Sequence, residues 1–187
     1  MQERRASITD PAALAALAHP VRLDVLGYLM TSGPATASAC ARAVGDSPSN
    51  CSYHLRVLAR HDLVRAVESA DGRERPWEAL VTGFTLDPDD ASDSATALVE
   101  ASMQLDHHLA REYLRTRDTA PASWRSVDTH ASYGVRVTPD EMRRITEQID
   151  AIVRPFIAAT RDDAPADAAV AHVSVLAFPR AGFGVDS

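Results

Sequence analysis

The stretch Ser47-Pro-Ser-Asn-Cys-Ser-Tyr-His-Leu-Arg-Val-Leu58 predicts a capped amphipathic helix, and the rest of the expected fold is arranged around it. Ser47 can accept a hydrogen bond from the free amides of the first turn, and a proline suits the first helical position. Cys51, Leu55 and Leu58 recur at the spacing of one helix face, so this face is expected to point inward. The opposite face carries groups that can contact base edges or phosphates, namely Ser49, Asn50, Ser52, Tyr53 and Arg56.

Three shorter helices are expected before this stretch. Asp10 followed by a proline marks the start of a helix over residues 12–18, and a second helix is expected over residues 20–30. A third helix over residues 37–43 is closed by Gly45. A helix of about two turns, a turn that contains glycine and a capped helix together make the helix-turn-helix pattern.

After this helix the hydrophobic period changes from 3.6 residues to 2, which predicts strands. Residues 63–69 and 74–80 are expected to pair as a hairpin around an Asp-Gly turn at residues 70–73. Such a hairpin would be a wing beside the helices. Arg73 and Arg75 lie at or near its tip, where they could reach phosphates or a minor groove.

The second half of the sequence predicts one long helix and a small α+β unit. Apolar positions indicate a helix over residues 94–117, long enough to pair with a second subunit. A strand over residues 133–137, a capped helix beginning at Thr138 and a strand over residues 169–178 should follow. The expected division of the chain is a winged helix-turn-helix at 8–82, a loop and dimerisation helix at 83–118, a C-terminal extension at 119–180 and a flexible tail at 181–187. The fold class is thus mainly α with a small β component.

The charge distribution and hydropathy of the sequence indicate which classes of partner to expect. The 187 residues have a formal net charge of −7, but residues 1–80 hold 9 Arg against 9 acidic residues, so the deficit lies in the second half. A balanced first half can bind nucleic acid with modest non-specific affinity. We find no apolar run long enough to span a membrane and no secretory pattern, so a cytoplasmic protein without a membrane partner is expected.

At residues 10–82 the sequence resembles the ArsR-type winged helix-turn-helix transcription regulators. The segments that carry the resemblance are Ala18-His-Pro-Val-Arg-Leu-Asp-Val-Leu26, Gly33-Pro-Ala-Thr36, residues 47–58, Leu63-Val64 and Gly72-Arg-Glu74 with Trp77. The C-terminal third is similar, more weakly, to an extension found in an actinobacterial subgroup of these regulators.

The resemblance implies a homodimeric repressor that places two recognition helices in successive major grooves of double-stranded operator DNA. The positions that match the family's DNA contacts are Ser49, Asn50, Ser52, Tyr53, Arg56 and Arg73; Arg75 and His54 are added to them, although His54 could instead pack beneath the helix. One alternative is a metal-responsive sensor on the same scaffold. Another is a winged helix that binds a protein partner and no DNA.

The sets of metal ligands known from the family are incomplete in this sequence. Many relatives use a Cys-x-Cys pair on the third helix, but here Cys40 stands alone, and both cysteines are expected to be buried thiols. Asp106 and His108 match half of another family site on the long helix, where Thr119 stands in place of a second histidine. We therefore expect no metal and no cofactor, with Asp106 and His108 as the remaining candidates for a weak site.

The C-terminal third admits two hypotheses. It could be a structural unit that enlarges the dimer, which we favour, or it could hold a small organic effector in an apolar pocket. The walls of such a pocket would be Tyr113, Trp124, Tyr133 and Phe156. No phosphate loop, nucleophile elbow or zinc-protease motif is present in the sequence, so no enzyme activity is expected.

Overall fold

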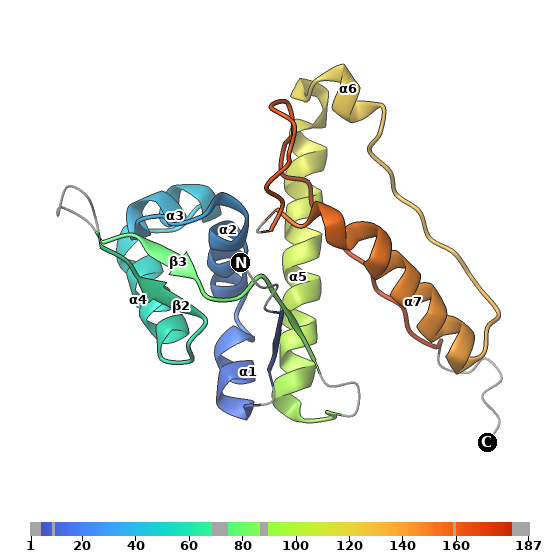
Figure 1. The fold of residues 1–187 in the computed structure, drawn as a ribbon, viewed down its shortest axis with the longest axis horizontal. Helices are drawn as coiled ribbons and strands as arrows, with labels where there is room; N and C mark the ends of the chain where they lie inside the picture. Colours follow the sequence, from blue (N-terminus) through green and yellow to red (C-terminus); the bar gives the residue numbers. More distant parts are fainter. Residues whose placement is uncertain (1–4, 9, 69–74, 87–89, 159, 181–187) are drawn as a thin grey trace.

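A computed structural model describes residues 5–8, 10–68, 75–86, 90–158 and 160–180. Four short helices and a hairpin form a module that packs against one end of a long helix, and the C-terminal third extends from the far side of that helix (Figure 1). The mainly α fold class with a winged helix-turn-helix and a long helix is therefore confirmed.

The helices of the first half lie where the caps predicted them. Their bounds are α1 Pro11–Leu17, α2 Pro20–Ser32, α3 Ala37–Val44 and α4 Pro48–Ala59. The side chains of Asp10, Thr36 and Ser47 each accept a hydrogen bond from a first-turn amide, so they satisfy donors that a helix start leaves free.

The strands are shorter than expected. β2 (Val64–Ala66) pairs antiparallel with β3 (Trp77–Ala79), and Arg65 lies opposite Glu78 with their side chains in an ion pair of 2.5 Å. The predicted turn at 70–73 lies outside the described residues. A second, parallel pair joins β1 (Arg5–Ser7) to β4 (Gly83–Thr85), and the sequence did not predict it.

The long helix α5 (Asp93–Thr116) has the predicted length and continues as the 3₁₀ turn η1 (Arg117–Thr119). Its first half buries Ala95, Leu98 and Ala101 against the first module. The core of that module is built from leucines, of which Leu14, Leu17, Leu26, Leu55 and Leu58 have no exposed surface.

The C-terminal third agrees with only part of the prediction. The helix is present as α7 (Pro139–Val153), followed by η2 (Arg154–Phe156), and a short α6 (Ala122–Arg125) lies where the sequence predicted no helix or strand. The prediction of two flanking strands is wrong, because residues 133–137 and 169–178 form no strand. Their β-branched residues have no neighbouring strand to pair with, and β propensity depends on such a partner.

Within the described residues no single helix is both long and apolar enough to cross a membrane. Helices α1 and α2 would together have the length and composition, but they are bent by 89° at the break between them. Their leucines lie in the core of the first module.

Candidate nucleic-acid interface

The turn between α3 and α4 sets the direction of the recognition helix. Gly45 follows α3 with φ 70° and ψ 33°, a left-handed conformation that glycine adopts without steric cost. The amide of Asp46 donates to the carbonyl of Ala41 at 3.0 Å, and the hydroxyl of Ser47 then accepts from the amide of Asn50 at 3.2 Å. The chain thus ends one helix and starts the next within three residues.

One face of α4 is held in the core. Cys51, Leu55 and Leu58 have no exposed surface, which confirms the inward stripe that the sequence predicted. α4 has four buried residues on one side, so its other side faces outward, as in an amphipathic helix. The fourth of these positions is His54.

The outward face carries the polar groups. Tyr53 is 53% exposed, and Ser49 and Arg56 are also exposed on that side, whereas Ser52 is half-buried at its edge. Arg60, at the C-cap, is exposed as well and follows at the spacing 49, 53, 56, 60, which places all four residues on one stripe. Arg60 was not among the residues predicted from the sequence, although the same helical spacing that predicts Arg56 also leads to Arg60.

Asn50 lies at the start of this helix and is held by Asp46. Its side-chain amide nitrogen donates to Asp46 Oδ2 at 2.6 Å, and the backbone amide of Ser47 donates to Asp46 Oδ1 at 2.6 Å. These two bonds lower the pKa of Asp46 from its ordinary value, with the Ser47 amide as the larger cause. The side chain of Asn50 is therefore oriented before any ligand binds. Its carbonyl oxygen and its second amide hydrogen remain able to form hydrogen bonds with a ligand.

His54 is a correction to the predicted DNA contacts. Its side chain is 3% exposed, because it turns inward beneath α4. Its ring lies 4.7 Å from the ring of His19, at the start of α2, and 5.3 Å from that of Tyr53. Burial, followed by the nearby His19 and Arg22, lowers the pKa of His54, so a neutral ring is favoured at this place.

The wing has two described arginines, of which Arg65 is paired with Glu78. Arg75 is exposed where the chain returns toward β3, and Arg73 lies outside the described residues. The isolated pairing of Ala35 with Trp77 connects β3 to the segment before α3, with hydrogen bonds of 2.9 and 2.7 Å. This contact fixes the hairpin next to the helix-turn-helix.

The candidate metal ligands take other partners. Asp106 accepts a hydrogen bond from Ser174 and lies 2.9 Å from Nε2 of His172, while His108 is exposed. His172 comes from a segment 66 residues away, and the residue pattern along the long helix did not predict it as a neighbour of Asp106. Among the described residues no three His, Cys, Asp or Glu side chains form a group that could hold a metal ion.

The two cysteines are buried thiols. Cys40 and Cys51 are both free and have no exposed surface. Burial, with Cys51 as a second cause, raises the pKa of Cys40 to about 11, which keeps this thiol protonated and unreactive at neutral pH.

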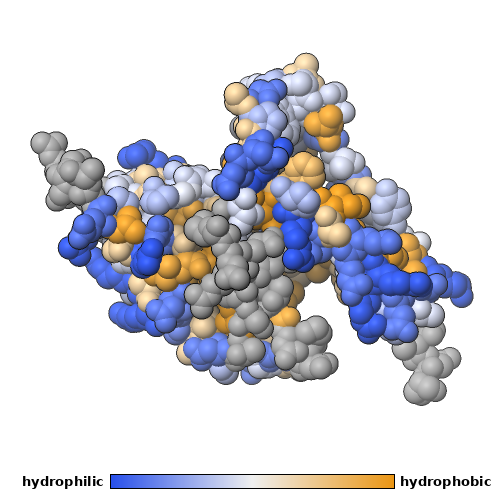
Figure 2. All heavy atoms as spheres, in the orientation of Figure 1, coloured by the Kyte–Doolittle hydropathy of each residue, from blue (hydrophilic) through white to orange (hydrophobic). Residues whose placement is uncertain are grey.

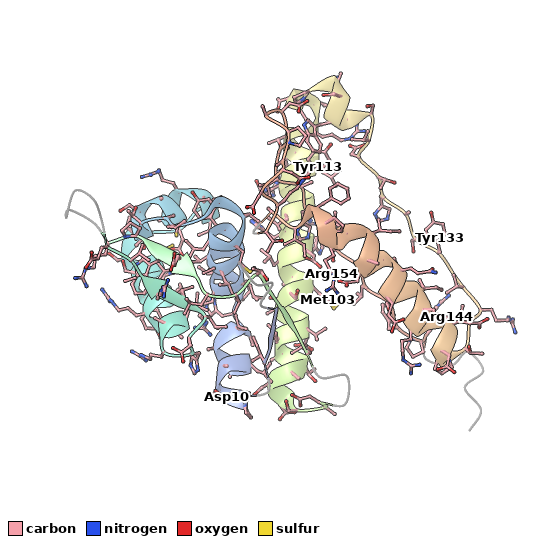
Figure 3. The ribbon with its side chains drawn as sticks, in the orientation of Figure 1. Asp10, Met103, Tyr113, Tyr133, Arg144 and Arg154 are labelled. Atoms are coloured by element: carbon pink, nitrogen blue, oxygen red, sulfur yellow. The ribbon has the colours of Figure 1, made fainter. Side chains whose placement is uncertain are left out.

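The four proposed effector-binding aromatics do not form an enclosed pocket. Tyr133 is 81% exposed, Phe156 60%, Trp124 38% and Tyr113 37%. Tyr113 donates to Asp128 at 2.7 Å, and Figure 3 shows Tyr113 on α5 and Tyr133 on the extended chain between α6 and α7. These exposures show no enclosure by the single chain, and the hypothesis of an effector pocket walled by these side chains stays a prediction.

Comparison with known proteins concerns mainly this first module. Residues 17–67 match the model of the family described as "Helix-turn-helix domain". No match to a curated protein is found.

Several solved structures are similar to parts of the chain. The homodimeric winged helix-turn-helix DNA-binding domain of Mb0332 from Mycobacterium bovis, a possible ArsR-family regulator, is 24% identical, with 54% of this chain and 81% of that chain covered and a TM-score of 0.34. A double mutant of ZitR from Lactococcus lactis is 13% identical over 73% of each chain, with a TM-score of 0.31. A mutant of MepR from Staphylococcus aureus, bound to an oligodeoxyribonucleotide, is 15% identical over 73% of this chain and 78% of that chain, again with a TM-score of 0.31.

TM-scores below 0.5 do not by themselves establish a shared overall arrangement, so the family match and the observed elements decide the assignment. The matched residues hold α2, α3 and α4, and the β2–β3 hairpin packs beside them. Residues 17–67 of this chain thus match the helix-turn-helix domain family, and with the hairpin they form a winged helix-turn-helix, in agreement with the ArsR-type resemblance of the sequence.

Proposed function

We propose that the chain is a sequence-specific DNA-binding transcription regulator that acts in the cytoplasm as a homodimeric repressor. The observation that carries the proposal is the stripe Ser49, Tyr53, Arg56 and Arg60, which a capped helix with a fully buried opposite face presents to solvent. Hydroxyl, phenol and guanidinium groups on a rigid helix are suited to phosphates and to base edges in the major groove. MepR, a similar structure, was solved with an oligodeoxyribonucleotide bound.

We expect the arginines to contact phosphates and Asn50 to contact a base. Arg56 and Arg60 would contact phosphates, and Arg75 would do so from the wing. Asn50, already oriented by Asp46, would read a base edge, because an amide can offer both a donor and an acceptor to adenine. We propose no direct DNA contact for His54, which is buried.

The test is binding of the purified chain to the DNA upstream of its own gene, measured by fluorescence anisotropy over a series of salt concentrations. Arg56→Ala should weaken binding to all sequences and reduce the slope of log K against log salt by about one. The matched control is Arg144→Ala, an exposed arginine on α7 that lies far from α4 (Figure 3). A slope that falls equally in both variants would show that Arg56 is not a specific contact.

Recognition of the DNA sequence by α4 is tested separately with Asn50→Ala. It should relax preference at one base pair by about 1–3 kcal/mol and leave the salt slope unchanged. If neither Arg56→Ala nor Asn50→Ala alters binding to DNA that the wild type does bind, α4 is not the DNA-reading helix. If the wild type binds no DNA at all, the module would be one that binds a protein partner.

A further inference from the structure

Asn50, in the first turn of α4, is held by the two residues that precede this helix. Its backbone amide donates to the hydroxyl of Ser47 at 3.2 Å, and its side-chain nitrogen Nδ2 donates to Oδ2 of Asp46 at 2.6 Å. Asn50 is exposed, so water competes for its polar groups. The side chain therefore keeps one orientation only if Asp46 is itself fixed.

Asp46 is fixed by the main chain on both sides. Its amide donates to the carbonyl of Ala41, in the last turn of α3, at 3.0 Å, and its Oδ1 accepts from the amide of Ser47 at 2.6 Å. The bonds from Ser47 and Asn50 lower the pKa of Asp46, so its carboxylate stays ionised at neutral pH. An ionised carboxylate has no proton to donate, and the hydrogen bonds that it accepts are stronger than those between neutral groups. Asp46 is thus a fixed acceptor beside Asn50.

A fixed acceptor permits one orientation of the Asn50 amide. A rotation by half a turn about the last side-chain bond would bring Oδ1 of Asn50, in place of Nδ2, to Oδ2 of Asp46. Two acceptors would then face each other with no proton between them. An asparagine without such a neighbour exchanges its donor and its acceptor easily, because this bond has a broad, roughly two-fold preference. Asp46 therefore decides which side of the amide is the donor and which is the acceptor.

Two of the four bases match the groups that Asn50 leaves free. These groups are the oxygen Oδ1 and one hydrogen on Nδ2. In the major groove adenine and cytosine each present an amino group, whereas the corresponding positions of guanine and thymine are carbonyl oxygens. The oxygen of a locked Asn50 would meet a donor on the first two bases and an acceptor on the other two. An unlocked Asn50 could turn its NH₂ group to either carbonyl.

The place of Asn50 suits contact with a base better than contact with a phosphate. In helix-turn-helix proteins the N-terminal residues of the recognition helix contact base edges in the major groove. Asn50 is the third residue of α4 and follows Ser49, which belongs to the outward stripe. Figure 2 shows hydrophilic residues along the outer edge of the module, where α3 and α4 lie. The ionised Asp46 would repel a phosphate, so the pair fits better against the edge of a base.

We infer that Asp46 is a positioning residue that makes Asn50 selective for bases with an exocyclic amino group, adenine or cytosine, against guanine and thymine. The inference rests on the proposed DNA-binding function and names the class of base that this part of the site recognises. Asp46 would not touch the base. It would act by excluding the reversed orientation of the Asn50 amide.

The first experiment finds the base that Asn50 contacts. Wild type and Asn50→Ala are each used to select bound duplexes from a pool with a random core of about 25 base pairs, long enough for two major grooves one helical turn apart. The base whose preference is lost in Asn50→Ala is then replaced by one without an amino group, purine for adenine or pyrimidin-2-one for cytosine. By fluorescence anisotropy this replacement should weaken binding about 10-fold in wild type and less than about 2-fold in Asn50→Ala.

The second experiment tests Asp46 with Asp46→Asn, which preserves the size of the side chain. The oxygen of the new amide can still accept from Ser47, which leaves its NH₂ group facing Asn50. Asn50 should then turn its own oxygen to position 46 and its NH₂ group to the base. When guanine replaces the contacted adenine, or thymine the contacted cytosine, wild type should lose at least about 10-fold in affinity and Asp46→Asn less than about 3-fold. Asp46→Ala, which leaves Asn50 free to take either orientation, should also lose less than about 3-fold.

Two controls separate the orientation of Asn50 from the charge of Asp46. Asp62→Asn removes the same charge beyond the other end of α4, at a φ of 53° that asparagine also adopts, and should keep the full discrimination of wild type. The double variant of Asn50→Ala with Asp46→Asn should have the same base preference as Asn50→Ala alone, because Asp46 acts only through Asn50. Far-UV circular dichroism reports that each variant is folded.

The outcomes distinguish this inference from the proposed function. A wild type that selects no sequence and binds no duplex would refute DNA binding and the inference with it. A wild type that selects a sequence would leave DNA binding standing, and the inference would then fail if Asn50→Ala kept every preference or if Asp46→Asn kept the full discrimination. A change of preference caused by Asp46→Asn in the Asn50→Ala background would show that Asp46 contacts the base directly, which would also refute its role as a positioning residue.

Discussion

The two halves of the molecule differ in how they bury apolar side chains. Among the described residues, every buried side chain lies within residues 8–101, and none lies within residues 102–180. Both halves contain capped amphipathic helices, so the local sequence signals for helix formation are similar in the two. What differs is that the first half folds its apolar faces against one another, whereas the second half leaves them open. The first half therefore has a core of its own, whereas the second half exposes many of its apolar side chains.

The largest expected effect tests the self-sufficiency of the first half. Leu55→Ala removes a fully buried side chain from beneath the recognition helix and should lower the free energy of unfolding by about 2–5 kcal/mol. Val170→Ala, at a residue that is 64% exposed, should change it by less than about 0.5 kcal/mol. Urea unfolding followed by circular dichroism measures both, and similar losses would contradict the contrast between the halves.

The next effect concerns the histidine pair beneath α4. Nδ1 of His19 and of His54 are buried without a hydrogen-bond partner, and burial is the largest cause that lowers both pKa values below 6.5. As the pH falls below 6.5, the unfolded chain binds protons that the folded chain excludes, so the folded state loses stability. Asp46 opposes this effect, and Arg22 adds to it.

We therefore expect the free energy of unfolding to be constant above about pH 7.5 and to fall as the pH approaches 5. His19→Gln and His54→Gln should each make this fall shallower, since each removes one of the titrating groups. Urea midpoints at a series of pH values give the measurement. Wild-type midpoints that stay level from pH 7.5 to 5 would speak against a buried neutral pair.

The smallest effect concerns the second half alone. Thr138→Ala removes the hydroxyl that caps α7 and should cost about 1 kcal/mol of the stability of this helix. Amide hydrogen exchange should then be faster within α7 and unchanged within α4, because the two helices share no core. Faster exchange in both helices would mean that the halves unfold as one unit.

Local signals in the sequence were sufficient for the helices. Asp10, Ser47 and Thr138 cap the helices that they were predicted to cap, and Gly45 ends α3 in the left-handed region. The inward stripe of α4 is also confirmed. These features depend on neighbouring residues, so a linear pattern contains them.

Signals that depend on distant residues were less informative. The segments 133–137 and 169–178 have strand-like composition but no pairing partner, and β1 and β4 pair although neither stood out. The sequence predicted no histidine partner for Asp106 on the long helix, and His172, 66 residues away, lies beside it in the structure. His54 matched a family motif, yet its ring lies under the helix rather than on its outer face.

The sequence by itself determined where the helices begin and end and which side of α4 is apolar, because caps and 3.6-residue periodicity act over one or two turns. Only the tertiary structure decided that the rings of His54 and His19 lie against each other and that Asp106 meets His172. Each of these outcomes depends on which segments meet in space. That choice follows from how the whole chain packs and not from any local pattern.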